Sequence, residues 1–326
     1  MLCAYAASTS SDDPLAALAV GDLPDPPGPG TVPGDPVTVT VRAAALNHHD
    51  LWTLKGSVVP AHGLPCVLGT DAAVVDDAGG EYVVHSVLGD PSRGHGDETL
   101  DPGRLILSDA GLGALRGRIT VPRRNLVPKP PELGWAEAAC LPTAWLTAYR
   151  MLFTKAGARP GDRVLVHGAG GGVSTAAILL AKGAGLDVQV MTRDAARGER
   201  AEALGADRVL LTGATVPGDA DIVLDTVGGS TWSTSLAAVR PGGTIVVSGA
   251  TAGFGVRTNL ARLFSRQITV RGSTLGTIDD LRSLLRFVVA AKVRPVIDSV
   301  APLSAARDQF ARLASGTAFG KLVIEP

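Results

Sequence analysis

The chain has 326 residues, of which 45% are hydrophobic and 19% are charged, so it holds enough apolar material for two globular domains. Its formal net charge of −1 gives no electrostatic reason to expect a nucleic acid or an anionic membrane as a partner. No apolar run approaches the ~20 residues of a membrane-spanning helix. The N-terminal residues also lack the basic and apolar regions of a secretory signal, so we expect a cytoplasmic location.

The first 125 residues are predicted to be rich in β-structure. Short strand-like runs alternate there with turns, and Val37–Val41 alternates valine and threonine as a half-buried strand does. Pro24–Pro36 contains too much proline for a sheet ladder and is predicted to form a surface loop. Asp90–Gly103 is polar and turn-rich, so an exposed loop is expected there as well. Between these segments, Ala43–Trp52 concentrates polar residues between apolar flanks.

From Glu132 onward the pattern changes to alternating helices and strands. Trp135–Phe153 predicts a long helix that Pro142 interrupts, and Ile278–Ala291 predicts another helix. Six strands are expected, at Val164–Val166, Asp187–Thr192, Val209–Leu211, Asp221–Asp225, Thr244–Ser248 and Ile268–Arg271. This alternation predicts a doubly wound parallel sheet. The last helix and strand are expected to return to the first domain.

The most informative stretch is Arg163–Thr192, which reads as strand, glycine turn, helix and strand. The turn has the spacing Gly168-x-x-Gly171-x-x-Ser174, one residue longer than the usual G-x-G-x-x-G. A helix that starts at such a turn offers unpaired N–H groups and a partial positive charge to a phosphate. We therefore predict a dinucleotide site, with an ordinary crossover that binds no ligand as the alternative. Serine at the third glycine position strains the packing of helix on strand without forbidding it.

The end of the second strand indicates which dinucleotide binds. An acidic residue there would hydrogen-bond the ribose of NAD. This chain has Thr192 and Arg193 instead, with Arg197 on the following helix, and a guanidinium can pair with a 2′-phosphate. We therefore predict NADP(H). Asp194 would restore an NAD-type acid if the register differed by one residue.

Six ordered motifs, which together cover essentially the whole chain, resemble the medium-chain dehydrogenase/reductase superfamily. They are Leu46-Asn47-x-x-Asp50-Leu51-Trp52, Leu68-Gly69-Thr70-Asp71, Ala138-Ala139-x-Leu141-Pro142 with Leu146-Thr147-Ala148-Tyr149, the Gly168 turn, Ala203-Leu204-Gly205-Ala206-Asp207, and Phe319-Gly320-Lys321. The chain is most similar to the zinc-independent, quinone-oxidoreductase-like branch.

The resemblance implies an α/β fold with a GroES-like, β-rich catalytic domain and a Rossmann domain built on the doubly wound parallel sheet. The catalytic domain would comprise residues 1–125 and be completed by 297–326. The Rossmann NADP(H)-binding domain would comprise residues 126–296. The resemblance also implies a homodimer that pairs the sixth strands, and a small-molecule carbonyl or quinone substrate.

Zinc is not expected in this chain. In the zinc-dependent alcohol dehydrogenases of the superfamily, a cysteine, a histidine and a second cysteine hold the catalytic metal. The matching positions here are Asn47, Thr70 and about Thr143, whose amide and hydroxyl groups supply neither thiolate nor imidazole. The adjacent histidines His48 and His49 are a poor pair of ligands for one ion.

The predicted reaction is hydride transfer from the nicotinamide to a quinone or an α,β-unsaturated carbonyl. The candidate catalytic residues are Asn47, His49 and Asp50. Asn47 would hydrogen-bond the carbonyl or the carboxamide, and His49 would donate a proton unless solvent does so. Asp50 is expected to anchor its loop through backbone N–H groups, or else to orient His49.

The resemblance also suggests which residues contact the cofactor. They are His48, Thr147, Gly168, Gly170, Gly171, Gly172, Val173, Thr192, Arg193, Arg197, Val227, Ser248, Gly249, Leu275, Gly276 and Lys321. Three alternative functions stay open. One is an enoyl-thioester reductase, although that branch has a tyrosine where this chain reads Gly56-Ser57-Val58. The others are a pathway-specific natural-product reductase and a nucleotide-binding protein with little catalysis.

Overall fold

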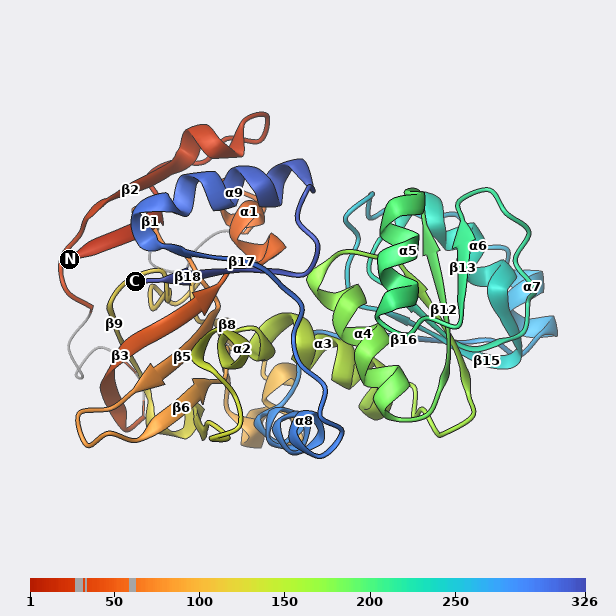
Figure 1. The fold of residues 1–326 in the computed structure, drawn as a ribbon, viewed down its shortest axis with the longest axis horizontal. Helices are drawn as coiled ribbons and strands as arrows, with labels where there is room; N and C mark the ends of the chain where they lie inside the picture. Colours follow the sequence, from red (N-terminus) through yellow and green to blue (C-terminus); the bar gives the residue numbers. More distant parts are fainter. Residues whose placement is uncertain (27–31, 33, 59–62) are drawn as a thin grey trace. The chain divides into compact units, whose positions relative to one another are not determined.

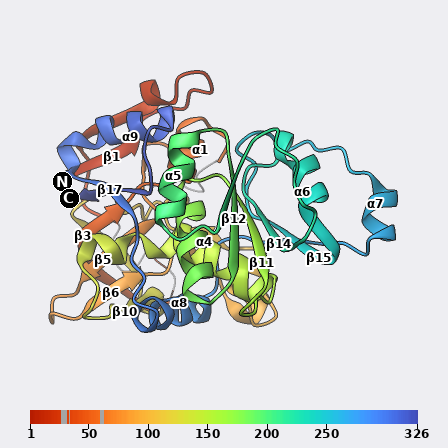
Figure 2. The same cartoon turned by 45° about the vertical axis from the view of Figure 1, so that its right-hand side comes forward.

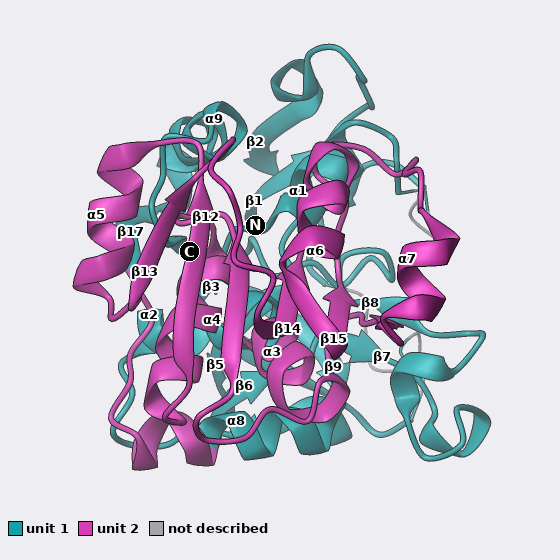
Figure 3. Cartoon of the chain, turned by 90° about the vertical axis from the view of Figure 1, so that its right-hand side faces the viewer, with its two compact units in different colours: residues 1–144, 277–285, 297–326 teal, residues 145–276, 286–296 magenta. Residues whose placement is uncertain are grey.

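The computed structural model describes residues 1–26, 32, 34–58 and 63–326 (Figure 1). The chain divides into two compact units (Figure 3). Unit 1 comprises Met1–Ala144, Thr277–Leu285 and Ile297–Pro326, and unit 2 comprises Trp145–Gly276 and Arg286–Val296. Within these described ranges, no helix has both the length and the apolar character needed to cross a lipid bilayer.

Unit 1 is built mainly from β-strands. Its strands are β1 (Leu2–Ala6), β2 (Leu18–Asp22), β3 (Pro36–Ala45), β4 (Cys66–Val67), β5 (Asp71–Val75), β6 (Glu81–Val84), β7 (Val87–Leu88), β8 (Leu105–Ile106), β9 (Arg118–Pro122), β10 (Leu126–Pro128), β17 (Ile297–Pro302) and β18 (Lys321–Glu325). Its helices include α1 (His48–Leu54), α2 (Trp135–Ala139) and α9 (Ala306–Ser315), while α8 (Ile278–Ala290) contributes residues to both units.

The largest sheet of unit 1 is organised around β3. The strand order is β10-β6-β5-β3-β18-β17, and β9 pairs with β3 outside this path. β3 pairs antiparallel with β5, β9 and β18. The last strand of the chain therefore lies beside one of the first, and β18 carries Lys321 into the interior of this sheet.

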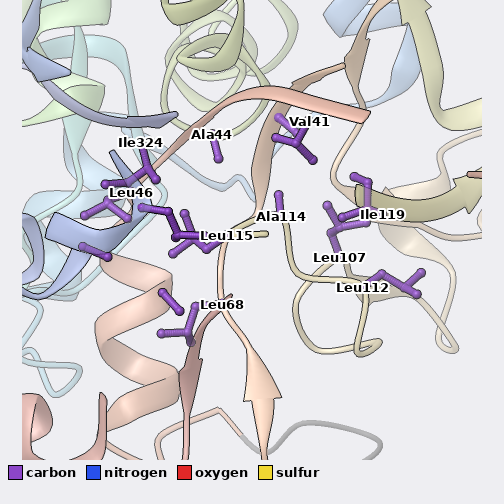
Figure 4. Packing of buried hydrophobic residues seen from close by; sticks show 14 of the residues in the cluster. Val41, Ala44, Leu46, Leu68, Leu107, Leu112, Ala114, Leu115, Ile119 and Ile324 are labelled. Carbon is purple, nitrogen blue, oxygen red and sulfur yellow. The ribbon is translucent and has the colours of Figure 1, made fainter. Parts of the chain in front are cut away.

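The core of unit 1 is formed largely by aliphatic side chains (Figure 4). Leu46 and Leu68 are at most 2% exposed, and they pack in one cluster with Leu115 and Ile324. Leu46 and Leu68 each directly precede a segment that carries polar side chains. Burial of the leucines therefore fixes where those polar side chains begin.

Unit 2 contains the parallel sheet that the sequence predicted. Its strands are β11 (Arg163–His167), β12 (Asp187–Thr192), β13 (Arg208–Leu211), β14 (Ala220–Asp225), β15 (Val239–Val247) and β16 (Thr269–Gly272). Their order, β13-β12-β11-β14-β15-β16, is that of a Rossmann fold and confirms the predicted class. The order reverses between β11 and β14, and ligands of such sheets bind at the carboxyl ends of the strands around this point.

Five α-helices lie wholly within unit 2. They are α3 (Leu146–Tyr149), α4 (Gly172–Gly183), α5 (Ala195–Ala203), α6 (Trp232–Ala238) and α7 (Leu260–Ser265). α4 contacts β11 and β12, α5 contacts β12 and β13, and α6 contacts β14 and β15 (Figure 2). Because crossovers of this kind are right-handed, the reversal of strand order places α6 on the face opposite α4 and α5.

The long helix predicted at Trp135–Phe153 is present in pieces. α2 and α3 are separated by π-helical turns at Leu141–Trp145, and a second π-helical segment follows at Arg150–Lys155. Pro142 has no N–H group to donate, so a regular α-helical ladder cannot run through it. The first π-helical segment carries Thr143, one of the positions that matches a metal ligand.

The prediction of an exposed loop at Asp90–Gly103 was wrong for its central residues. Glu98, Thr99 and Asp101 are buried. Asp101 accepts hydrogen bonds from the N–H groups of Asp90 and Gly103, and Glu98 Oε1 accepts one from the N–H of Ile278 at 2.6 Å. The carboxylates lie inside because they satisfy backbone donors, which the polar composition alone does not reveal.

The boundary between the two units differs from the predicted one at residue 125. β10 pairs with β6, and α2 contacts β3 and β5, so residues 126–144 belong to unit 1. The change to helical periodicity near Glu132 marks a change of secondary structure rather than of domain. Within the predicted loop Pro24–Pro36, residues 27–31 and 33 lie outside the described residues.

Candidate active site

The turn before α1 is held by Asp50. Its Oδ2 accepts the N–H of Asn47 at 2.8 Å, and its Oδ1 accepts the N–H of Gly69 at 2.8 Å. Burial raises the pKa of this carboxyl, while the two backbone donors oppose the shift. Oδ2 thus holds the N-cap residue of α1, and Oδ1 ties the helix to the chain before β5. These contacts agree with the anchoring role that the sequence suggested for Asp50.

The three positions that match metal ligands come together in unit 1. Asn47 Nδ2 lies 3.0 Å from Thr70 Oγ1, and Thr70 Oγ1 lies 3.1 Å from Thr143 Oγ1. Asn47 precedes α1, Thr70 precedes β5, and Thr143 lies in the first π-helical segment. Three separate elements therefore meet through short hydrogen bonds between neutral groups.

Lys321 adds a cation to this group. Its Nζ is buried and donates to the carbonyl of Leu46 at 2.7 Å, to Asn47 Oδ1 at 2.6 Å and to Asp71 Oδ2 at 3.2 Å. An ammonium has three N–H donors, and here each has an acceptor. We call Asn47, Thr70, Asp71, Thr143 and Lys321 the polar cluster.

These contacts change two expectations from the sequence. Lys321 was predicted to contact the cofactor, but its ammonium is the internal counter-ion of the fully buried Asp71. Asn47 was predicted to hydrogen-bond a substrate or carboxamide, but its amide is engaged at both ends, since Nδ2 also lies 2.9 Å from Asp71 Oδ2. A lysine is almost never fully buried unless it is paired, and its partner could not be read from the sequence.

The polar cluster does not fit a zinc ion. Zinc binds thiolate, imidazole or free carboxylate, whereas the cluster offers an amide, two hydroxyls and a carboxylate that is already paired with an ammonium. Burial raises the pKa of the Cys66 and Cys140 thiols to about 12. Over the described part of the chain, no three His, Cys, Asp or Glu side chains are grouped to hold a metal.

His49 pairs with an acid that the sequence did not single out. Its Nε2 lies 2.9 Å from Asp109 Oδ1, and the two side chains are 12% and 13% exposed. Burial alone would lower the pKa of His49, but the hydrogen bond and charge of Asp109, together with the charge of Asp50, raise it. The orienting partner of His49 is therefore Asp109, not Asp50.

The adjacent histidine, His48, is exposed and makes no hydrogen bond to a described residue.

The glycine turn of unit 2 leaves the start of α4 open. Gly168 has a φ of +86°, a left-handed conformation that glycine adopts without strain, and Gly170 follows in the same turn. Gly171 is the N-cap residue, and no side chain caps the helix that begins with Gly172 and Val173. The first N–H groups of a twelve-residue helix are thus available to an anion.

Ser174 is accommodated at the third glycine position. Its side chain is buried, and its hydroxyl donates to the carbonyl of Gly171 at 3.0 Å. A Cβ added at Gly168 would meet Ser174 Oγ at an ordinary 3.8 Å. The serine therefore satisfies its hydroxyl within its own helix, and the strain expected from the sequence is not seen.

The segment after β12 has the residues expected for a 2′-phosphate. Thr192 is buried at the strand end, and Arg193 is exposed with no hydrogen bond or ion pair to a described residue. Asp194 caps α5, because its Oδ1 accepts the N–H of Arg197 at 3.3 Å and its Oδ2 lies 3.6 Å from Arg197 Nε. The acid that would have indicated NAD is thus engaged by the helix terminus and by a guanidinium.

A buried polar network links the ends of β11 and β14. Asp225 Oδ1 accepts the N–H groups of Val227 at 3.0 Å and Gly228 at 2.9 Å. Its Oδ2 accepts the hydroxyl of Ser235 at 2.7 Å, and that hydroxyl lies 2.8 Å from His167 Nε2. Burial lowers the pKa of His167. The network therefore fixes the chain at the point where the strand order reverses.

The remaining residues predicted to contact the cofactor follow neighbouring strands of unit 2. The N–H of Ser248 donates to the carbonyl of Asp225 at 3.1 Å, and a Cβ on Gly249 would lie 2.8 Å from the Thr226 carbonyl. Leu275, beside the buried Gly276, has a φ of +44°, a strained conformation that tends to occur at functional sites. Thr147 is buried in α3, which contacts α4.

Comparisons with known proteins agree with this architecture. The family model for zinc-binding dehydrogenases matches residues 172–290. A 2-methylene-furan-3-one reductase from Solanum lycopersicum is 33% identical over 301 residues, which cover 90% of this chain and 72% of that protein. A crotonyl-CoA reductase from Streptomyces avermitilis is 27% identical over 353 residues, which cover 90% of this chain and 78% of that protein.

A solved structure is similar over its whole length. The crystal structure of an NAD-dependent alcohol dehydrogenase matches with a TM-score of 0.89 at 34% identity, and the match covers 100% of both chains. The similarity in sequence and that in structure therefore both extend across the two units. The chain belongs to the medium-chain dehydrogenase/reductase superfamily of oxidoreductases.

Proposed function

We propose that the protein is a zinc-independent, NADPH-dependent reductase of α,β-unsaturated carbonyl compounds or quinones. The polar cluster carries this proposal. Asn47, Thr70 and Thr143 stand together where metal ligands would stand, and Lys321 already supplies a cation to the same group. A carbonyl substrate would therefore be activated by hydrogen bonds and a proton donor rather than by a Lewis acid.

Unit 2 supports the cofactor assignment. The nicotinamide, when bound, supplies a hydride from its C4 atom. The open N-terminus of α4, at Gly171, Gly172 and Val173, would hold the pyrophosphate. The exposed Arg193 would hold the 2′-phosphate, since Asp194 is committed to capping α5. The residues after β14, β15 and β16 would line the remaining cofactor surface.

The names of two relatives support the substrate class. Both 2-methylene-furan-3-one and crotonyl-CoA carry a carbon–carbon double bond conjugated to a carbonyl group, in a ketone and a thioester respectively. Reduction adds a hydride to the β-carbon and a proton to the α-carbon. Because one relative acts on a thioester, an enoyl-thioester reductase stays the second candidate. A pathway-specific natural-product reductase would be one case of the same chemistry.

The assay that tests this proposal combines binding with turnover. NADPH fluorescence is followed on addition of protein, and oxidation of NADPH is then measured with a quinone, an alkenal and an enoyl thioester. We expect saturable binding and turnover of at least one substrate by protein whose zinc content is far below one ion per chain. Binding without turnover would favour a nucleotide-binding protein. If the purified protein holds one zinc ion per chain and loses its activity when that ion is removed, zinc independence is contradicted.

Replacing Arg193 with alanine should weaken NADPH binding and leave NADH binding nearly unchanged. A hydrogen bond to a charged group contributes about 1.5–3 kcal/mol, so the Kd for NADPH should rise by about tenfold to a hundredfold. Both dissociation constants are measured by fluorescence titration. Arg208→Ala, at the opposite end of the neighbouring strand β13, is the matched control and should change neither. Equal weakening for both cofactors would show that Arg193 does not bind the 2′-phosphate.

We also propose a homodimer formed through β16. This strand is at the edge of the sheet in unit 2, and Phe254, Leu260 and Phe264 are 86%, 67% and 73% exposed in the preceding segment. Large exposed apolar side chains are typical of interfaces. The double variant Phe254→Ser/Phe264→Ser should convert a dimer to a monomer in light scattering. Leu211→Ser, on the opposite edge strand β13, should leave the dimer intact. A monomeric wild type would refute the proposal.

A further inference from the structure

We propose that Asp109 is a positioning residue that holds His49 as the proton donor of the reduction, with Nδ1 as the donating atom. The inference rests on the proposed function, because it needs a substrate that takes up a proton. It goes beyond that function by assigning the source of the proton. From the sequence, either His49 or solvent could donate it. The supporting contacts all lie within unit 1.

The pairing fixes which ring nitrogen is free. A carboxylate only accepts hydrogen bonds, so Nε2 of His49, which lies 2.9 Å from Asp109 Oδ1, must carry a proton. Nδ1 makes no hydrogen bond to any described residue. When the ring is protonated, its second N–H is therefore available to a substrate.

Both members of the pair are held in place. His49 lies in the first turn of α1, where its carbonyl accepts the hydroxyl of Thr53 at 3.2 Å and the ring of Trp52 packs edge-on at 6.5 Å and 71°. Asp109 follows the fully buried Ser108, whose carbonyl accepts the Cys66 thiol at 3.5 Å. The imidazole thus has one partner and little freedom to turn away from it.

The charges around His49 favour its protonated form. Asp109 and Asp50 are the charged groups that act on the ring, and both stabilise an imidazolium. Their effect exceeds the opposing effect of burial, so the pKa of His49 is raised. A general acid must be protonated before it can donate, and the two carboxylates favour that state of His49.

In the proposed step, the substrate takes up a hydride and then a proton from His49. A hydride from the reduced nicotinamide brings an electron pair to the substrate β-carbon, and the double-bond electrons move to form an enolate. The N–H bond at Nδ1 of His49 breaks, and its proton forms a C–H bond at the α-carbon. The imidazole is left neutral with its Nε2–H still donated to Asp109, and water returns the proton. The substrate is reduced and the nicotinamide is oxidised.

The variants Asp109→Asn and His49→Gln test this assignment. General acid catalysis is worth about a hundredfold or more, so His49→Gln should lower kcat by about that factor with little change in KM. In the wild type, kcat should be full below the raised pKa of His49 and fall as the pH rises through it. Asp109→Asn removes the charge that supports the imidazolium, so this fall should move to lower pH. Asp109→Glu, which keeps the charge, should retain a profile close to that of the wild type.

A matched control is Asp76→Asn, because Asp76 is a half-buried acid of unit 1 that accepts backbone N–H groups of its own turn. It should leave the pH profile unchanged. Full kcat in His49→Gln, or an unshifted profile in Asp109→Asn, would overturn the proposal and point to solvent as the donor.

A second measurement does not depend on turnover. The titration of His49 is followed by NMR, with His49→Gln to assign the signal, and its pKa should fall in Asp109→Asn. An unchanged pKa would refute the pairing. Asp109→Ser, which also removes the charge, replaces the asparagine variant if that variant does not fold. If wild-type protein reduces no substrate while this titration behaves as expected, the proposed function fails and the pairing stands.

Discussion

Replacement of Gly172 by aspartate is expected to weaken NADPH binding by about a hundredfold or more while leaving the fold intact. Gly172 is the first residue of α4, where the uncapped N–H groups would hold the pyrophosphate. A carboxylate there faces the phosphate charge, and like charges brought together cost several kcal/mol, which weakens binding by about a hundredfold or more. The same carboxylate interacts favourably with the helix dipole, so the melting temperature should not fall. Fluorescence titration and a thermal melt measure the two effects.

Gly172→Asn is the matched control for this change. Asparagine has nearly the shape of aspartate without its charge, so it should weaken NADPH binding much less. If both variants lose binding equally, the space beside the helix rather than the charge limits the cofactor. If neither variant loses binding, the pyrophosphate does not lie at the N-terminus of α4, and the cofactor assignment falls with it.

Replacement of Lys321 by methionine is expected to produce the largest loss of stability. Methionine fills a similar volume but leaves the carboxylate of Asp71 buried without its cation. Breaking a buried ion pair from one side typically costs about 3–5 kcal/mol. The free energy of unfolding, measured with urea, should fall by that amount. The carbonyl of Leu46 and the amide of Asn47 also lose a donor in this variant.

Two further variants show whether the loss of stability in Lys321→Met comes from the unpaired carboxylate of Asp71. Lys182→Met is the matched control, because Lys182 pairs with Asp207 at 2.8 Å on the surface, where an ion pair contributes about 0–1 kcal/mol. Adding Asp71→Asn to Lys321→Met removes the uncompensated charge and should recover part of the lost stability. Equal losses in Lys182→Met and Lys321→Met would show that the polar cluster does not depend on its cation.

Much of the fold could be predicted because it depends on local patterns. Alternating apolar runs and helical periodicity indicated the parallel sheet, and each observed strand overlaps the one expected, as for Asp221–Asp225 against β14. The glycine turn was recognisable because its conformation is encoded where it occurs. Gly168 needs a positive φ, and the helix start needs small residues.

The contacts of the candidate site could not be predicted because they join distant parts of the chain. Asp109 is 60 residues from His49, and Lys321 is 250 residues from Asp71. Neither pairing leaves a periodic or compositional signal, since both depend on how β18 and the turn after β8 are packed. Glu98 shows the same limit, because its polarity suggests exposure until the N–H of Ile278 is found beside it.

The cysteines of unit 1 also have a consequence for measuring its motions. Cys3, Cys66 and Cys140 are all buried and unpaired, and each belongs to unit 1. A thiol reagent can reach them only when that unit opens, because buried thiols are inert in the closed state. Since unit 2 contains no cysteine, the labelling rate of the native protein reports the opening of one half of the molecule and is silent about the other.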